Sequence, residues 1–192
     1  MRKSVAEKKK IVVAVTGASG SIYAQRLIEL LEEQKHEISV VVSDYALQVI
    51  QAEIGKLKTV SGTQKFNNRS MNAPFASGSA LCDAMVIIPC SMGTLGRIAS
   101  GASDDLILRA ADVFLKEKRK LILVPRESPL NLIHARNLVA AIEAGAHVIP
   151  AMPSFYSKPK DLEEAVDTVV ARVLDALGVK NPIAKRWGED RH

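Results

Sequence analysis

Short runs of apolar, mostly β-branched residues alternate with longer segments of helical periodicity along most of the chain. The runs at residues 11–16, 38–43, 85–89, 121–125 and 148–150 are almost continuously apolar or β-branched, which predicts strands buried on both faces of a parallel sheet. Between and after them, apolar residues at helical spacing predict helices at 21–34, 45–54, 103–118, 130–144 and 161–177. This order predicts the α/β class: a Rossmann-like, doubly wound parallel sheet in a three-layer αβα sandwich.

The length of 192 residues and a hydrophobic content of 47% suit a single domain with a substantial core. We expect a basic N-terminal tail at residues 1–10, an α/β domain at 11–178 and a C-terminal tail at 179–192. The least regular stretch, residues 55–78, carries several Asn, Ser and Gly residues. It is either a lid or an ordinary surface excursion.

Composition argues against several classes of function. The net charge is +5, but Arg2, Lys3 and Lys8–Lys10 lie in the first ten residues, where a solvated tail explains them better than nucleic-acid binding. No apolar stretch is long enough to span a bilayer, and no export signal is visible. Cys82 and Cys90 match no zinc or redox spacing. We therefore expect a soluble, cytoplasmic protein without a metal site.

Small and hydroxyl-bearing residues follow three of the predicted strands. The sequence TGASGS at 16–21 lies between a strand and a helix, Ser43 ends the second strand, and PCSMGT at 89–94 follows the third. The carboxyl ends of parallel strands share one edge of the sheet, and ligands bind there. Backbone N–H groups at the start of a helix favour a phosphate. The sequence therefore predicts a mononucleotide site at this edge.

Cationic side chains suggest a second anion site. Arg109 and Lys116 are seven residues apart, so they share one face of a predicted helix, and Arg126 with Glu127 follows the fourth strand. Asp104 and Asp105 do not complete an Asp-Asp-x-x-Asp box. A monophosphate held by Arg and Lys alone fits this pattern better than a metal-bound diphosphate.

Together these motifs resemble the flavin prenyltransferase family, the UbiX group of flavoproteins. The resemblance covers about residues 11–178 and rests on five motifs in the family's order: VTGASG at 15–20, ASGS at 76–79, PCSMGTL at 89–95, RAADVFLKE at 109–117 and VPRE at 124–127. The PSFY sequence at 153–156 and the ARVL sequence at 171–174 extend it.

The resemblance implies a metal-independent transfer of the dimethylallyl group from dimethylallyl monophosphate to N5 and C6 of reduced FMN. The product would serve a decarboxylase of the UbiD type. Ser19, Glu53, Glu127 and Lys116 would be catalytic, with Ser19 and Glu53 guiding protons. FMN would be bound by Gly17, Ala18, Ser19, Ser43, Ser91, Met92, Gly93, Thr94 and Arg126. The prenyl phosphate would be bound by Arg109, Lys116, Glu127, Tyr156 and Arg172.

The resemblance also implies a homo-oligomer, usually a dodecamer, with active sites between subunits. Arg172 or Trp187 could then act across an interface. One departure is Met71, which stands near the place of a pocket tryptophan in some members. Two alternatives stay open: a flavin-dependent cysteine decarboxylase of the same fold, and a non-enzymatic FMN-binding subunit. Neither needs Arg109, Lys116 and Tyr156 together.

Overall fold

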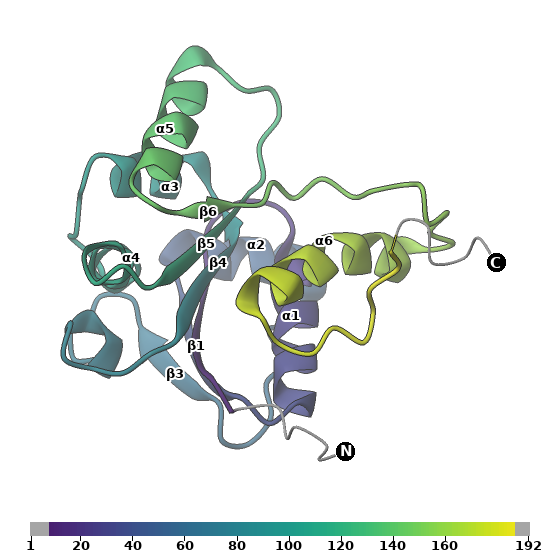
Figure 1. The fold of residues 1–192 in the computed structure, drawn as a ribbon, viewed down its shortest axis with the longest axis horizontal. Helices are drawn as coiled ribbons and strands as arrows, with labels where there is room; N and C mark the ends of the chain where they lie inside the picture. The colour runs from purple at the N-terminus through teal and green to yellow at the C-terminus, as the bar shows by residue number, and fades with distance from the viewer. Residues whose placement is uncertain (1–7, 187–192) are drawn as a thin grey trace, which may run out of the picture.

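The computed structural model describes residues 8–186 and contains one parallel sheet (Figure 1). Its strand order is β3-β2-β1-β4-β5-β6. The strands are β1 (Lys10–Val15), β2 (Glu37–Val42), β3 (Gln64–Asn67), β4 (Ala84–Cys90), β5 (Lys120–Pro125) and β6 (His147–Val148). The predicted doubly wound sheet is confirmed.

Helices cover both faces of this sheet. The helices α1 (Ser21–Glu33), α2 (Asp44–Ile54) and α6 (Leu162–Leu177) pack on one face. The helices α3 (Met92–Ala99), α4 (Leu106–Lys116) and α5 (Leu132–Glu143) pack on the other. In β1, Val13 belongs to the first of these cores and Val12 to the second. This two-sided burial explains why the central strands read as continuous apolar runs. Figure 1 shows α4 and α6 on opposite sides of the sheet.

The irregular stretch at 55–78 is packed into the fold. It supplies the edge strand β3 and the 3-10 helix η1 (Pro74–Ala76), whose Phe75 is 1% exposed. Asn68 accepts the N–H of Leu106 through its carbonyl oxygen at 2.8 Å and the N–H of Ile107 through Oδ1 at 3.0 Å. This buried contact at the start of α4 favours the ordinary excursion over the lid.

The direction in which successive strands are added to the sheet reverses at its centre, between β1 and β4. Strands β1, β2 and β3 run outward on one side, and the chain then returns to place β4 beside β1. The space beyond the carboxyl ends of β1 and β4 is therefore the switch point at which such sheets bind ligands.

The ends of the chain are only partly described. The predicted basic tail falls mostly on residues 1–7, and Trp187 is also outside the described residues. The division into two tails and one domain stays a prediction. In the part of the chain that the structure covers, no helix is long and apolar enough to cross a membrane.

Candidate functional site

Thr16, which directly follows β1, ties the carboxyl ends of the two central strands together. Its backbone N–H and its hydroxyl both donate to the carbonyl oxygen of Pro89, at 3.2 and 2.8 Å. The same hydroxyl accepts the N–H of Ser91 at 2.8 Å. Because Thr16 is buried, these bonds are shielded from water and fix the loops after β1 and β4 relative to each other. Sequence reasoning gave Thr16 no role of its own, although a threonine that ends a buried strand is a usable signal.

Ser43 and Ser91 each cap a helix at this edge. The hydroxyl of Ser43 accepts the N–H of Ala46 at 3.2 Å, and that of Ser91 accepts the N–H of Thr94 at 3.3 Å. The Ser91 hydroxyl also donates to the hydroxyl of Thr94 at 3.0 Å. Both serines are therefore N-caps, and α2 and α3 begin after β2 and β4, the two strands that flank β1.

The first turn of α3 offers backbone donors that the described chain leaves unused. Within residues 8–186, no acceptor faces the N–H groups of Met92 and Gly93. A Cβ added to Gly93 would meet nothing within 4 Å, so the space in front of this turn is open. Free N–H groups at a helix N-terminus, with the positive end of the helix dipole, favour a phosphate. Together with the hydroxyls of Ser91 and Thr94, these N–H groups are the donors available to an anion at this place.

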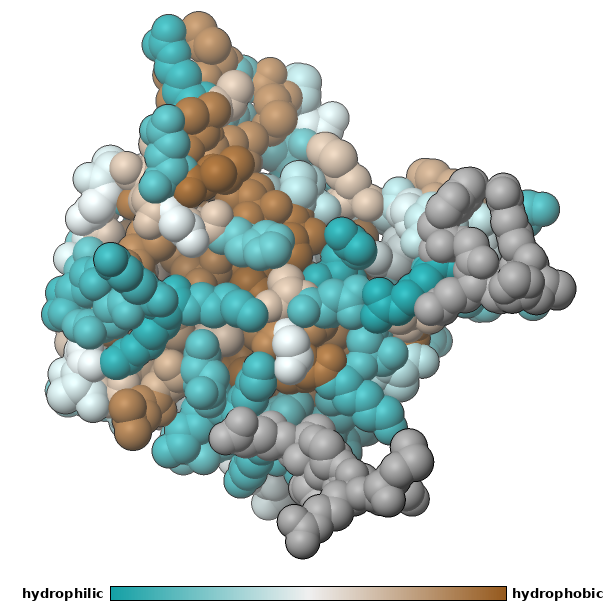
Figure 2. Space-filling view, in the orientation of Figure 1, coloured by the Kyte–Doolittle hydropathy of each residue, from teal (hydrophilic) through white to brown (hydrophobic). Residues whose placement is uncertain are grey.

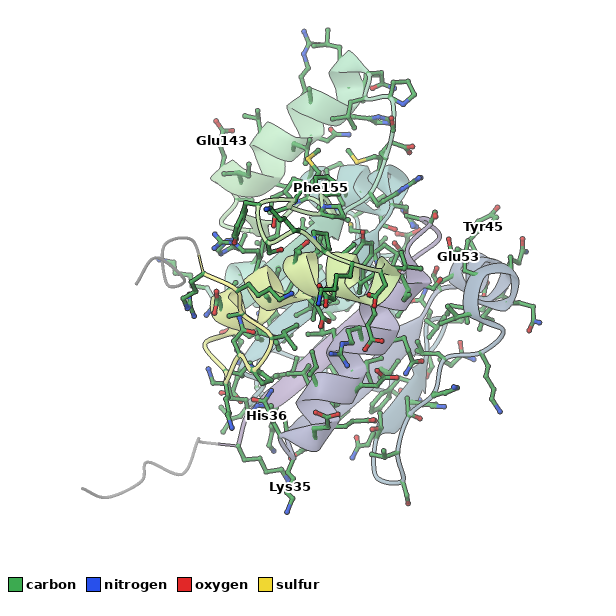
Figure 3. The ribbon with its side chains drawn as sticks, turned by 90° about the vertical axis from the view of Figure 1, so that its right-hand side faces the viewer. Lys35, His36, Tyr45, Glu53, Glu143 and Phe155 are labelled. Carbon is green, nitrogen blue, oxygen red and sulfur yellow. The ribbon has the colours of Figure 1, made fainter. Side chains whose placement is uncertain are left out.

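The start of α1 is occupied differently. The carboxylate of Glu53, from the end of α2, accepts the N–H of Gly20 at 3.0 and 3.1 Å and the N–H of Ser21 at 2.7 Å. Figure 3 labels Glu53 on α2. Partial burial acts to raise the pKa of Glu53, but hydrogen bonds from the Ser19 side chain and from these amides outweigh it, and the pKa is lowered. The sequence predicted that the N–H groups of this loop bind a phosphate. In the structure, the N–H groups of Gly20 and Ser21 instead donate to the carboxylate of Glu53.

Gly17 is required by a close approach. A Cβ added to Gly17 would lie 2.7 Å from the Cβ of Tyr45, in the first turn of α2. Gly20 adopts φ 117°, in the left-handed region, and a Cβ there would lie 2.8 Å from the ring of Tyr23. The loop after β1 is therefore packed against both α1 and α2. Ala18 and Ser19, also predicted to contact the cofactor, lie in this loop.

Arg126 and Glu127 lie where β5 ends at the same edge. The N–H of Arg126 donates to the carbonyl oxygen of Cys90 at 3.2 Å, and both side chains are exposed. Burial raises the pKa of the Tyr23 hydroxyl, and the positive charge of Arg126 opposes this rise, so the guanidinium lies near the first turn of α1. Glu127 accepts the N–H of Ser128 at 3.0 Å. The structure thus gathers the predicted cofactor residues at one edge.

The other predicted cations are divided between two places. Arg109 and Lys116 lie on α4, where Arg109 pairs with Asp112 at 3.2 Å and Lys116 pairs with Glu117 at 2.6 Å. The helices α4 and α6 cover opposite faces of the sheet. Within a single chain, Arg109 and Lys116 on α4 are therefore separated from Arg172 on α6.

Tyr156 and Arg172 lie together on the α6 side. Both line a pocket of about 480 Å³ between the segment before α6 and the chain that follows it. The Tyr156 hydroxyl donates to the carbonyl oxygen of Lys185 at 2.9 Å. Arg172 is exposed, and no carboxylate of residues 8–186 forms a salt bridge with it. This half of the predicted phosphate site therefore lies in a pocket with an exposed guanidinium.

Exposed apolar side chains gather on α5, in which only Ala141 is buried. Figure 2 shows apolar surface along α5 that continues toward the middle of the same face. The exposed residues at this helix and just before it are Leu130, Leu132, Ile133, Val139 and Ile142. An exposed apolar surface of this kind is suited to contact with another protein. Met71, at the predicted pocket position, is also 44% exposed.

Other reactive groups do not form a site. Complete burial raises the pKa of the Cys90 thiol to about 12, so Cys90 is a core residue rather than a nucleophile. Among residues 8–186, no three His, Cys, Asp or Glu side chains come together as metal ligands.

Comparisons with known proteins identify the family and the fold. The flavoprotein family model matches residues 2–175. The flavin prenyltransferase UbiX of Methanocaldococcus jannaschii is 45% identical over 183 residues, covering 93% of this chain and 98% of the relative. A crystal structure of a UbiX protein in complex with FMN and dimethylallyl pyrophosphate superposes with a TM-score of 0.89 at 39% identity, covering 95% and 98% of the two chains. A dodecameric FMN-dependent UbiX-like decarboxylase from Escherichia coli O157:H7 gives 0.87 at 41% identity, covering 93% and 98%.

Proposed function

Because this chain belongs to the flavoprotein family and, within it, to the flavin prenyltransferases, we propose that its switch-point edge binds reduced FMN and prenylates it. The transferred group is dimethylallyl, and the acceptor atoms are N5 and C6 of the flavin. The observation that carries this proposal is the open anion site at the start of α3, where the N–H groups of Met92 and Gly93 have no internal acceptor among the described residues. This site fits the phosphate of a mononucleotide.

The residues present fit FMN. Ser91 and Thr94 would bind the phosphate together with the α3 amides, and Ser43 lies at the start of the neighbouring helix. Arg126 would add a positive charge at the same edge. The remaining cofactor contacts would come from the loop at residues 17–19. When bound, reduced FMN supplies the electron-rich ring atoms that attack the prenyl carbon.

The residues on α4 and α6 would bind the prenyl phosphate. When the allylic C–O bond breaks, the electron pair leaves with the phosphate, so fixed cations around that oxygen stabilise the transition state. Arg109, Lys116 and Arg172 would supply these cations, and Tyr156 a hydroxyl donor. Glu127, beside Arg126, would complete the site.

We propose a monophosphate as the leaving group. Asp112 pairs with Arg109 and Glu117 pairs with Lys116, so neighbouring carboxylates already offset the charge of both α4 cations. A site with this limited net positive charge suits a monophosphate better than a diphosphate. The solved relative that contains dimethylallyl pyrophosphate is compatible with the same class of prenyl donor.

Glu53 and Ser19 would handle protons at the flavin. Because its pKa is lowered, Glu53 is an ionised and weakly basic carboxylate at neutral pH, so it would relay a proton that leaves the ring rather than retain it. The hydroxyl of Ser19, which hydrogen-bonds to Glu53, would lie between the carboxylate and the flavin. Their positions beside the loop after β1 support these roles.

We further propose a homo-oligomer, a dodecamer as in the solved relative, in which one chain's α4 cations meet a neighbour's Tyr156 and Arg172. The separation of the two sets within one chain and the apolar surface of α5 support this assembly. The product would serve a UbiD-type decarboxylase in the cytoplasm. A flavin-dependent cysteine decarboxylase and a non-enzymatic FMN-binding subunit are both less well supported, because neither accounts for the α4 cations.

Two experiments test these proposals. The Thr94→Val substitution should weaken FMN binding about tenfold, which corresponds to one lost phosphate hydrogen bond, and unchanged affinity would contradict the placement of the phosphate.

The shared site is tested with the Lys116→Ala and Arg172→Ala proteins, which are dissociated, mixed and then reassembled. Recovered prenyltransferase activity in the mixture, but in neither variant alone, is the expected result. No recovery in verified mixed oligomers would place both residues in one chain's site.

A further inference from the structure

The turn at residues 77–80, between η1 and β4, is held against α4 by arginine side chains from two sides. Nε of Arg109 donates to the carbonyl oxygen of Ala76 at 3.1 Å, and Nη2 of Arg119 donates to the carbonyl oxygen of Gly78 at 2.6 Å. The N–H of Ala80 closes the turn onto the carbonyl oxygen of Ser77 at 3.3 Å. The backbone of the turn therefore has a fixed place relative to both ends of α4.

The middle of this turn touches the Lys116–Glu117 ion pair. A Cβ added to Gly78 would collide with Oε1 of Glu117 and lie 2.9 Å from Nζ of Lys116. Neighbouring residues on a helix normally point apart, and this pair closes only because α4 ends here. Both side chains are exposed, so the ion pair alone would fix the ammonium weakly. Contact with the Gly78 backbone supplies the missing restraint.

Arg119 serves the turn rather than a surface ion pair. The N–H of Arg119 donates to the carbonyl oxygen of Phe114 at 2.8 Å, so the chain folds back and places its side chain beside the end of α4. Within residues 8–186, its Nη1 is buried without a hydrogen-bond partner, and no salt bridge to Arg119 is formed. The strongest contact of this half-buried guanidinium is the bond to Gly78.

We propose that Arg119 is a positioning residue of the prenyl transfer: it holds the Gly78 backbone against Lys116 and so sets the place of the Lys116 ammonium. This assignment rests on the proposed function, in which Lys116 binds the prenyl phosphate. The FMN residues lie on other loops, after β1, β2, β4 and β5. Loss of the Arg119 bond therefore affects the binding of the prenyl phosphate and leaves FMN binding intact.

The test is a double-mutant cycle between Arg119→Met and Lys116→Ala, with dimethylallyl monophosphate and reduced FMN as substrates. Arg119→Met should raise both the KM and the Kd of the prenyl phosphate about tenfold, with the FMN Kd unchanged within about twofold. The Lys116→Ala background is inactive and is therefore compared by the Kd of the prenyl phosphate. There the same replacement should have little further effect, because the residue through which it acts is gone. Lys118→Met, an equivalent loss of a nearby exposed cation, is the control and should match the wild type.

Arg119→Lys keeps one donor and the charge, so it should recover part of the KM loss, and it replaces the methionine variant in the cycle if that protein does not fold. An Arg119 effect of full size in the Lys116→Ala background would overturn the proposal, as would parallel losses of FMN affinity and prenyl phosphate affinity. If the wild type is active and Arg119→Met has the same KM for the prenyl phosphate, only the role of Arg119 is ruled out. A wild type that forms no prenylated flavin would remove the proposed function as well.

Discussion

The Glu53→Gln substitution removes a negative charge, which the carboxylate of Glu53 on α2 places at the N-terminus of α1. The carboxylate accepts the N–H groups of Gly20 and Ser21 at 2.7–3.1 Å. A charge at a helix N-terminus contributes about 0.3–1 kcal/mol, and charge-assisted hydrogen bonds add to this. Because the Glu53 side chain is exposed, water screens both contributions. We expect a loss of about 1 kcal/mol in the free energy of unfolding, or roughly 2–4 °C in Tm for a chain of this size.

The pH dependence of this loss identifies its cause. The pKa of Glu53 is lower in the folded protein than its ordinary value of 4.5. A carboxyl with a lowered folded pKa stabilises the fold above its unfolded pKa, and this contribution disappears as the pH falls through the folded pKa. The difference between the wild type and Glu53→Gln should therefore be full at neutral pH and should close on acidification below 4.5.

The assay is urea unfolding of both proteins at neutral pH and at about pH 3. Glu33→Gln, at the opposite end of α1, is the matched control and should cause no loss, because a negative charge there opposes the helix dipole. Equal stability of Glu53→Gln and the wild type at neutral pH would refute the reasoning. So would a difference that persists unchanged in acid.

Three further predictions concern packing and the thiol. Gly17→Ala should lower Tm and weaken FMN binding, because the added Cβ would lie 2.7 Å from the Cβ of Tyr45. Gly93→Ala is the control: its added Cβ meets nothing within 4 Å, so it should not lower the Tm of the FMN-free protein. Phe114→Ala should cost about 3–5 kcal/mol in urea unfolding, since Phe114 is fully buried in the core; a loss below about 1 kcal/mol would contradict that packing. Cys90, with its pKa raised to about 12, should resist iodoacetamide at mildly alkaline pH until the protein is unfolded, as peptide mass analysis would detect.

The sequence predicted the central strands closely and the sheet edge poorly. Strands β1, β2, β4 and β5 begin and end within about two residues of the predicted ranges, because burial on both faces selects continuous apolar residues. The strand β3 reads Gln-Lys-Phe-Asn and was missed. An edge strand pairs on one side and is largely exposed, so its sequence carries little apolar pattern.

The candidate site was predictable where residue type and strand order suffice. Ser43, Ser91 and Arg126 follow strands of one parallel sheet, so their common edge could be inferred from the sequence alone. The contact between Glu53 and Gly20 spans 33 residues of sequence, and no local pattern encodes it. The placement of α4 and α6 on opposite faces depends on where the chain crosses the sheet. The positions of Arg109, Lys116 and Arg172 along the sequence do not show on which face of the sheet each residue lies.

We propose that this chain attaches a prenyl group to reduced FMN at the switch-point edge. The most direct test is anaerobic incubation of the protein with reduced FMN and dimethylallyl monophosphate, followed by mass analysis of the extracted flavin. We expect a flavin that is heavier by one prenyl unit; this product should be absent with Lys116→Ala and less abundant with Tyr156→Phe. Unmodified FMN recovered from fully saturated wild-type protein would contradict it.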